Sequence, residues 1–201
     1  MVIALVLSGG TGSRLGADIP KQYLRVQERP VLLYCMETLH KSPVIDAIQV
    51  VAAQEWQEEI SGWLEEYGLT EKFRGFSLPG ENRQLSIFHG LTDIRKYAED
   101  DDLVLIHDAA RPLLSQKLIA DCVEAIEGHD GVLPVLPMKD TVYYSKDGRQ
   151  ITSLLDRQAV FAGQAPELFR LGIYYQANSA DQWIYGTGGS GGNADCHGPG
   201  G

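Results

Sequence analysis

Glycines and basic residues gather near the start of the chain, in the segment LSGGTGSRLGADIPKQ at residues 7–22. It follows a short apolar run, residues 2–7, that is typical of a buried strand. Glycine lets backbone N–H groups turn toward an anion, and Arg14 and Lys21 can add charge-assisted contacts. The segment therefore favours phosphate binding over a tight turn with solvated cations. The loop residues expected to face the phosphates are Ser8, Gly9, Gly10, Thr11 and Gly12.

The segment matches neither of two familiar phosphate-binding patterns. A dinucleotide fingerprint built on Gly10 and Gly12 has Leu15 where its last glycine belongs, and the same leucine interrupts a P-loop pattern. The phosphate interpretation rests instead on the two cations and on the position of the loop directly after a strand.

A second polar segment, HDAARP at residues 107–112, follows the apolar run LVLI. One carboxylate, Asp108, directly after a buried strand suits Mg²⁺, which takes few carboxylates and fills its shell with phosphate oxygens. The alternative for Asp108 is to cap a following helix. Arg111 is placed to pair with Asp108 or to contact phosphate, and His107 is expected to be buried and hydrogen-bonded rather than a ligand.

The third polar segment, GENRQLS, starts at Gly80 and precedes a helical pattern. Two interpretations stay open. In one, Asn82 caps the helix while Arg83 and Ser86 lie on the surface. In the other, backbone groups of Gly80 and Glu81 and the hydroxyl of Ser86 read the edge of a base.

Short apolar runs alternate along the chain with longer segments of helical periodicity. This alternation predicts right-handed crossovers and an α/β fold, a Rossmann-like, mainly parallel sheet with helices on both faces. Ligands of such sheets lie beyond the carboxyl ends of the strands, so the three polar segments are expected to meet at one crevice. The expected strands are 2–7, 47–53, 73–78, 103–107 and 132–135, and the expected helices are 30–41, 56–67, 84–97 and 116–126.

Beyond these elements, two extended runs, 141–145 and 150–153, flank an Asp-Gly pair. Asp-Gly between extended runs is a strong hairpin signal. The hairpin, about residues 139–157, either edges its own sheet or forms a protruding arm that reaches a second subunit. From the residues alone, the polar side chains that flank the hairpin are expected to make local contacts only: Asp140, Thr141 and Arg157.

The bulk composition limits the function further. With 44% hydrophobic and 22% charged residues, the 201-residue chain is typical of a globular protein, and a net charge of −10 argues against general nucleic-acid binding. No apolar run suits a membrane span, and three cysteines without C-x-x-C spacing suit a reducing cytoplasm. One domain, 1–180, is expected, followed by a glycine-rich, disordered tail, 181–201.

Five segments, taken in order, resemble the cytidylyltransferases that act on polyol phosphates. The resemblance runs from Met1 to about Phe169, and its most specific parts are the glycine loop and HDAARP. Known members act on 2-C-methyl-D-erythritol 4-phosphate or on ribitol 5-phosphate. The segments are SGGTGSRLGADIPKQYL, GENRQLSI, LVLIHDAARP, VLPMKDTV and LDRQAVFAGQAPELF.

The resemblance implies a role for each matching residue. Arg14 and Lys21 match the cations that stabilise the pentavalent phosphorus transition state, Asp108 matches the Mg²⁺ ligand, and Arg111 matches its neighbouring arginine, on the substrate side. The residues implied to hold the nucleotide beside the glycine loop are Gly80, Glu81, Arg83 and Ser86. The residues implied to grip the sugar-phosphate from the hairpin arm, across a homodimer, are Asp140, Thr141 and Arg157.

The implied reaction is transfer of CMP from CTP to a polyol phosphate, with Mg²⁺ and release of pyrophosphate. It needs no covalent enzyme intermediate, so positioning and charge stabilisation carry the catalysis. The favoured acceptor is 2-C-methyl-D-erythritol 4-phosphate, an isoprenoid precursor, because HDAARP and LDR lean toward it. AGQAPELF leans toward the alternative, ribitol 5-phosphate, a precursor of teichoic acid or capsule.

The chain also departs from the family's pattern. Ala165 and Glu167 stand where the family has the threonine and glutamine of TPQ. From Asp181 on, the family's acidic pair and the lysine of its N-x-K-[IV]-T motif have no match, which predicts weakened activity. Two further hypotheses therefore stay open: a catalytically impaired nucleotide-binding paralogue, and a nucleotidyltransferase that uses UTP or ATP with a sugar 1-phosphate.

Overall fold

The computed structural model describes residues 1–10 and 19–181. Thr11, Gly12 and Arg14 of the glycine loop lie outside the described residues, and so does the glycine-rich tail from residue 182 onward. The predictions made for them stay predictions.

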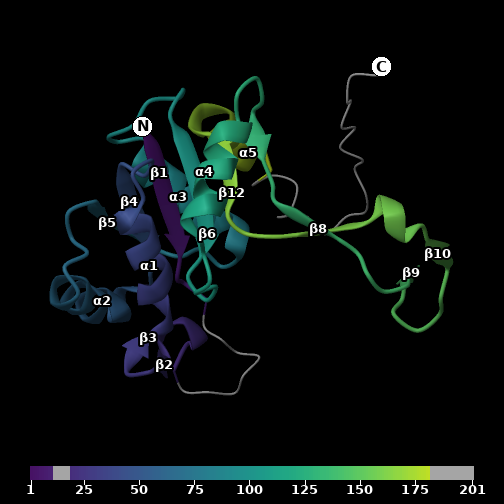
Figure 1. The fold of residues 1–201 in the computed structure, drawn as a ribbon, viewed down its shortest axis with the longest axis horizontal. Helices are drawn as coiled ribbons and strands as arrows, with labels where there is room; N and C mark the ends of the chain where they lie inside the picture. Colours follow the sequence, from purple (N-terminus) through teal and green to yellow (C-terminus); the bar gives the residue numbers. More distant parts are fainter. Residues whose placement is uncertain (11–18, 182–201) are drawn as a thin grey trace.

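A six-stranded sheet in the order β5-β4-β1-β6-β12-β7 forms the centre of the body (Figure 1). Its first four strands run parallel, and β12 then pairs antiparallel with both β6 and β7. The predicted mainly parallel α/β sheet is confirmed. The strands are β1 (Val2–Leu7), β4 (Ala47–Val51), β5 (Phe73–Ser77), β6 (Leu103–Asp108), β7 (Gly131–Val132) and β12 (Glu167–Arg170).

Helices cover both faces of this sheet, because alternate residues of each strand point to opposite sides. In β1, Ala4 and Val6 join one core with side chains of α1, α2 and α4, while Ile3 and Leu5 join the other with α3 and α5. The predicted helices are confirmed to within a few residues. They are α1 (Val31–Lys41), α2 (Gln54–Glu66), α3 (Arg83–Ile94) and α4 (Gln116–Ala125), and α5 (Leu171–Asp181) follows β12.

The strand expected at 132–135 is wrong in its extent. Pro134 interrupts it, since proline cannot donate to a sheet ladder. β7 ends at Val132, and a separate strand, β8 (Val135–Pro137), leaves the body and pairs antiparallel with β11 (Phe161–Gly163). This pair forms the stalk of the arm.

The hairpin itself is present, but its return strand begins later than expected. β9 (Val142–Tyr144) pairs antiparallel with β10 (Ser153–Leu155). The intervening segment is held as a turn because the Asp147 carboxylate accepts hydrogen bonds from the backbone of Arg149 and Gln150, both at 2.9 Å. β9 and β10 form a sheet of their own, so the alternative of a hairpin edging the central sheet is wrong.

The stalk and hairpin together project from the body as an arm, at the right of Figure 1. A short helical turn, η3 (Arg157–Ala159), lies in it between β10 and β11. Three further short elements follow the glycine loop: η2 (Lys21–Tyr23), β2 (Arg25–Val26) and β3 (Arg29–Pro30). Within 1–10 and 19–181, no helix combines the length and the apolar character that crossing a membrane requires.

Two helical glycines predict opposite effects on stability. A Cβ atom at Gly90 in α3 would lie 2.5 Å from Cδ1 of the fully buried Leu5, whereas one at Gly62 in α2 would meet no atom of residues 1–10 or 19–181 within 4 Å. We expect Gly90→Ala to lower the free energy of unfolding by about 1–3 kcal/mol through overpacking. Gly62→Ala should raise it by about 0.5–1 kcal/mol, because alanine loses less backbone entropy in a helix. Urea unfolding of both variants measures this, and equal shifts would contradict the packing assigned to Gly90.

Candidate active site

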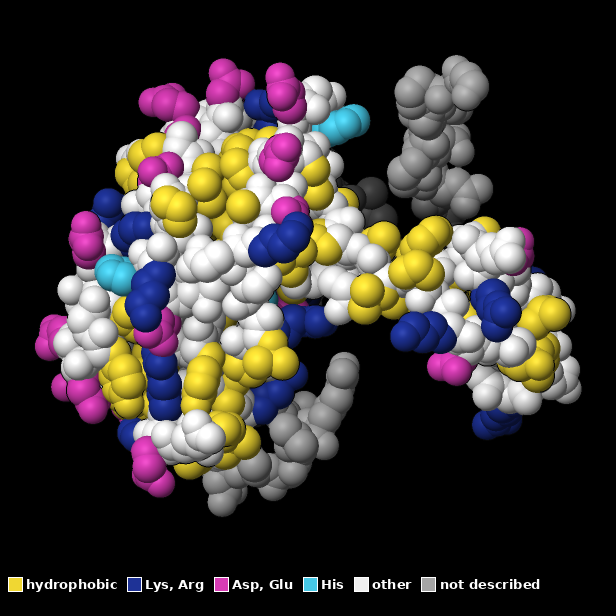
Figure 2. All heavy atoms as spheres, in the orientation of Figure 1, with side chains coloured by type: hydrophobic (Ala, Val, Ile, Leu, Met, Phe, Trp, Pro, Cys, Tyr) yellow, Lys and Arg dark blue, Asp and Glu magenta, His cyan; other side chains and the backbone are white. Residues whose placement is uncertain are grey.

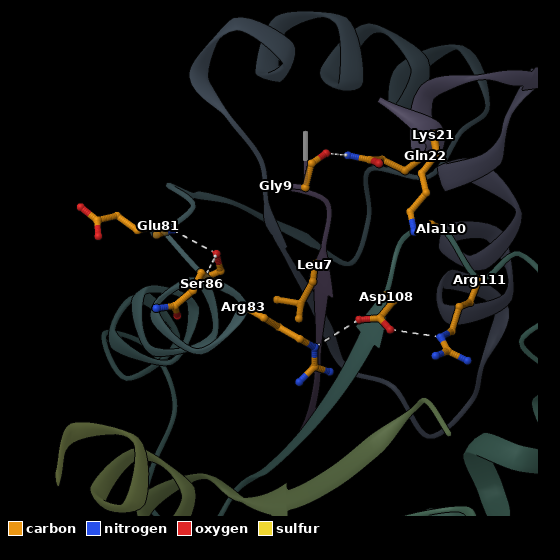
Figure 3. A pocket seen from close by; sticks show the side chains of 13 residues that line it. Leu7, Gly9, Lys21, Gln22, Glu81, Arg83, Ser86, Asp108, Ala110 and Arg111 are labelled. Carbon is orange, nitrogen blue, oxygen red and sulfur yellow. Dashed lines mark hydrogen bonds and ion pairs between the residues drawn. The ribbon is translucent and has the colours of Figure 1, made fainter. Parts of the chain in front are cut away.

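A pocket of about 710 Å³ opens at the carboxyl ends of β1 and β6 (Figure 3). The structure brings the three polar segments together here: the glycine loop after β1, the start of α3, and the segment after β6. The pocket is lined by Leu7, Gly9, Gly10, Lys21, Gln22, Gly80, Glu81, Asn82, Arg83, Ser86, Asp108, Ala110 and Arg111.

Gln22 fixes the backbone that enters the glycine loop. Its buried side-chain amide donates to the carbonyl oxygens of Ser8, at 2.7 Å, and Gly10, at 2.8 Å. The Tyr23 hydroxyl donates to the same Ser8 carbonyl, and burial raises the pKa of this tyrosine, which keeps it protonated. With η2 anchored in this way, the neighbouring Lys21 extends into the pocket (Figure 3).

Two glycines of the pocket are also required by packing. A Cβ atom at Gly9 would lie 2.5 Å from Cβ of Pro79, and one at Gly80 would lie 2.2 Å from Cβ of Leu85. Both distances are far shorter than a carbon–carbon contact allows. The loop before α3 therefore packs directly on the loop after β1, and the two loops share one wall of the pocket.

The start of α3 is organised by side-chain capping. Asn82 accepts a hydrogen bond from the backbone N–H of Leu85 at 2.8 Å, which confirms the predicted cap. The Ser86 hydroxyl accepts from the N–H of Gly80 at 3.0 Å and donates to the carbonyl of Asn82 at 2.9 Å. Figure 3 shows the Glu81 carboxylate directed away from Asp108. This capping fixes the backbone of Gly80 and Glu81 at the pocket wall.

Asp108 lies between two arginines. Its Oδ2 accepts from Nε of Arg111 at 3.1 Å, and its Oδ1 is 3.5 Å from Nε of Arg83 (Figure 3). The predicted Arg111 pair is confirmed, and the alternative of a helix cap at Asp108 is wrong, because Ser115 caps the next helix. Arg83 is half-exposed but is not simply a surface residue, since it also pairs with Glu167 at 3.2 Å.

His107 holds the backbone of Arg111, which pairs with Asp108. The side chain is buried, and its Nε2 donates to the carbonyl oxygen of Arg111 at 2.9 Å, as the sequence predicted. Burial lowers the pKa of His107, so the imidazole is neutral near pH 7. The neutral ring fixes the turn from which Arg111 reaches Asp108.

Comparison with known proteins decides the family. The family model described as 2-C-methyl-D-erythritol 4-phosphate cytidylyltransferase, IspD, matches residues 2–187. The chain belongs to the IspD family. It is therefore a cytidylyltransferase by family, within the nucleotidyltransferase class.

Relatives carry two different names. The 2-C-methyl-D-erythritol 4-phosphate cytidylyltransferase of Geotalea uraniireducens (strain Rf4) is 35% identical over 192 residues, which cover 92% of this chain and 80% of the relative. The ribitol-5-phosphate cytidylyltransferase of Lacticaseibacillus paracasei (strain ATCC 334) is 28% identical over 177 residues, which cover 88% and 75%. Among solved structures, the 4-diphosphocytidyl-2C-methyl-D-erythritol synthase of Anaerococcus prevotii DSM 20548 has a TM-score of 0.76 at 24% identity, covering 96% of this chain and 78% of that one. At that identity the likeness shows a shared fold.

Three residues that the IspD resemblance implies for the sugar-phosphate do not line the pocket. Asp140 and Thr141 precede β9 on the arm, and Arg157 begins η3, where it donates to the carbonyl of Lys139 at 3.4 Å. Within one chain the arm points away from the body (Figure 1). These residues therefore do not reach the pocket of their own chain.

The IspD pocket offers the carboxylate of Asp108 as a possible metal ligand. Across 1–10 and 19–181 no group of three or more His, Cys, Asp or Glu residues is arranged to hold an ion. Asp108 offers a carboxylate that is 32% exposed, and two guanidinium groups already lie against its oxygens, so the position accommodates cations. A single carboxylate fits Mg²⁺ that takes its other ligands from phosphate and water.

Sequence reasoning missed two residues of this site. Gln22 directly follows Lys21, so its place beside a candidate cation was the available signal. Glu167 reaches the edge of the site through Arg83, a contact between residues 84 positions apart. In the sequence, Glu167 stood out only because it replaces the neutral glutamine of the family's TPQ motif.

Proposed function

We propose that this protein transfers CMP from CTP to a polyol phosphate and releases pyrophosphate. The observation that carries the proposal is that Lys21 and Asp108 line one pocket together with Gly9 and Gly10, where Gln22 holds the carbonyls of Ser8 and Gly10. A nucleoside triphosphate needs backbone N–H groups and cations around its phosphates and a carboxylate for its metal. The glycine loop would wrap the triphosphate, with Arg14 adding a second cation to Lys21.

The wall formed by the start of α3 suits the nucleoside. The Ser86 hydroxyl gives its proton to Asn82 and one lone pair to Gly80, which leaves one lone pair to accept a hydrogen bond. Cytosine presents an amino group as donor, so this acceptor and the backbone of Gly80 and Glu81 would read the base. The neighbouring Arg83 supplies positive charge toward the phosphates.

The chemistry is an in-line displacement at the α-phosphorus of CTP. An oxygen of the sugar-phosphate forms the new P–O bond, the bond to the bridging α,β-oxygen breaks, and pyrophosphate leaves with that electron pair. Lys21 and Arg14 would stabilise the charge that develops on the pentavalent phosphorus. Mg²⁺ held by Asp108 would neutralise phosphate oxygens of CTP and of the leaving group.

The exposed surface of the arm favours a homodimer, in which the arm of one chain would complete the pocket of the other. A two-stranded hairpin is marginally stable alone, and exposed apolar clusters mark interaction surfaces. Figure 2 shows apolar side chains along the arm, and a second copy of the chain would cover them. The arm's polar residues, Asp140, Thr141 and Arg157, would then grip the sugar-phosphate in the partner's pocket, facing Arg111. The exposed apolar side chains of the arm include Leu136, Tyr143, Tyr144, Ile151, Leu154 and Phe161.

In this proposal residues 1–180 act as one nucleotidyltransferase domain, with 139–157 as the interacting arm. The favoured acceptor is 2-C-methyl-D-erythritol 4-phosphate, because the family model bears that name and relatives of that name reach 35% identity. Ribitol 5-phosphate is the second candidate, supported by relatives named for it at 28–31% identity. Since CTP is an intracellular nucleotide, we expect this activity in the cytoplasm.

Pyrophosphate release with CTP and Mg²⁺ tests the function directly. Turnover is expected with 2-C-methyl-D-erythritol 4-phosphate, and turnover with ribitol 5-phosphate alone would reassign the acceptor. UTP and ATP, each offered with a sugar 1-phosphate, should give no product. If neither polyol phosphate supports turnover while CTP with Mg²⁺ still raises the melting temperature, the protein is a nucleotide-binding paralogue without this activity.

A further inference from the structure

A row of four alternating charges crosses one side of the pocket. Glu167 Oε1 lies 3.2 Å from Nη2 of Arg83, Arg83 Nε lies 3.5 Å from Oδ1 of Asp108, and Oδ2 of Asp108 lies 3.1 Å from Nε of Arg111. The four side chains come from β12, α3, the end of β6 and the segment after it. Arg83 is thus shared between two carboxylates, of which only Asp108 lines the pocket.

The central sheet fixes the position of Glu167 relative to Asp108. In the antiparallel ladder, Glu167 lies directly opposite Ile106, two residues before Asp108. Residues opposite one another, and residues two apart along a strand, point to the same face. Glu167 and Asp108 therefore face the same side of the sheet, where Ile106 packs with α3, and Arg83 at the start of α3 lies between them.

Arg83 competes with any metal for the carboxylate of Asp108. A cation that binds Asp108 is repelled by both guanidinium groups, and this repulsion falls when one of them moves away from the carboxylate. Of the two, Arg83 makes the longer contact with Asp108, and within the described part of the chain only Arg83 has a second acidic partner, which lies closer. Arg83 can therefore keep its ion pair with Glu167 when Asp108 binds a metal ion instead.

We infer that Glu167 is a positioning residue that holds Arg83 back from Asp108 and so sets the Mg²⁺ concentration at which CTP binds. This inference rests on the proposed function of the pocket. Glu167 touches no reacting atom and acts through Arg83. Because Glu167 is 21% exposed and Arg83 46%, their ion pair adds little to folding stability.

The test is CTP binding by equilibrium dialysis over a Mg²⁺ titration, without a polyol phosphate, so that no turnover occurs. In Glu167→Gln the neutral amide keeps the side chain's shape but loses its charge, and Arg83 then pairs with Asp108 alone. We expect half-maximal CTP binding to need about two- to fivefold more Mg²⁺ than in the wild type. Glu66→Gln, at an exposed position at the end of α2, serves as the matched control and should leave the titration unchanged.

Repeating the test in an Arg83→Gln variant separates an effect of Glu167 through Arg83 from a general effect of losing one negative charge. If Glu167 acts through Arg83, then Arg83→Gln and the double variant Arg83→Gln/Glu167→Gln should show the same Mg²⁺ dependence. An equal shift from Glu167→Gln in both backgrounds would mean a general charge effect and would overturn the inference. An unchanged titration for Glu167→Gln would also overturn it, while wild-type CTP binding and pyrophosphate release would leave the proposed function standing. A wild type that binds no CTP at any Mg²⁺ concentration would overturn both.

Discussion

Lys21→Ala is expected to lower kcat for pyrophosphate release by about a hundredfold to a thousandfold, as removal of one charge-stabilising group at a transition state does. Lys21 extends into the pocket from a turn that Gln22 anchors to the glycine loop. The backbone that carries this side chain is therefore fixed beside the pocket before the negative charge develops on phosphorus. Because the side chain is exposed, its removal should leave the unfolding midpoint in urea unchanged.

The matched control for this variant is Lys117→Ala on α4. Lys117 is an exposed lysine that pairs with Asp121 on its own helix, and neither residue lines the pocket. Its kcat should equal that of the wild type. Lys21→Arg should recover only part of the rate, because a planar guanidinium cannot replace a compact ammonium atom for atom. A Lys21→Ala enzyme within threefold of the wild-type rate would rule out the role assigned to this residue.

The second large effect is complementation between two inactive variants. Lys21→Ala removes a residue of the pocket, whereas Arg157→Ala removes a residue of the arm. If the arm serves the partner's pocket, each pure variant is inactive, but a mixed dimer contains one intact site. Random pairing of equal amounts should restore about a quarter of the wild-type rate, since half of the dimers are mixed and half of their sites are complete.

The control for complementation pairs two variants of the same pocket. Lys21→Ala mixed with Asp108→Asn should restore nothing, because both residues line one chain's pocket and every mixed dimer keeps two damaged sites. The variants carry different affinity tags, so that formation of mixed dimers is verified by tandem purification. Mixed dimers of Lys21→Ala and Arg157→Ala without activity would show that the arm does not act across the interface.

The central fold was predictable because its strands and helices carry strong periodic patterns. Three of the four parallel strands, β1, β4 and β6, are rich in apolar residues, and the helices place their apolar residues on one face. β12 was not predictable, since Glu167–Arg170 is four residues long and finds its partners only after the arm has returned to the body. The break at Pro134 depends on one residue inside an otherwise strand-like run.

The site was predictable where residues follow the end of a strand. Lys21, Asp108 and Arg111 stand in such segments, and the structure gathers them around one pocket. Gln22 and Glu167 act by contacts that depend on the tertiary structure, so their sequence signals, a place beside Lys21 and a departure from the family motif, did not reveal those contacts. Arg83 shows the same limit, because its partners Asp108 and Glu167 lie on other elements.

The position of β12 in the sheet also determines the order in which the body can be completed. β12 lies between β6 and β7 although it follows both in the chain. During synthesis, β6 keeps an open hydrogen-bonding edge and β7 has no neighbour in this sheet until residues 167–170 emerge, and such long-range pairings form slowly. The entropy of closing a loop rises only gently with its length, so the arm that separates β7 from β12 can be long at little further cost to the fold. The last strand to join the sheet is thus the one that carries Glu167 to the edge of the pocket.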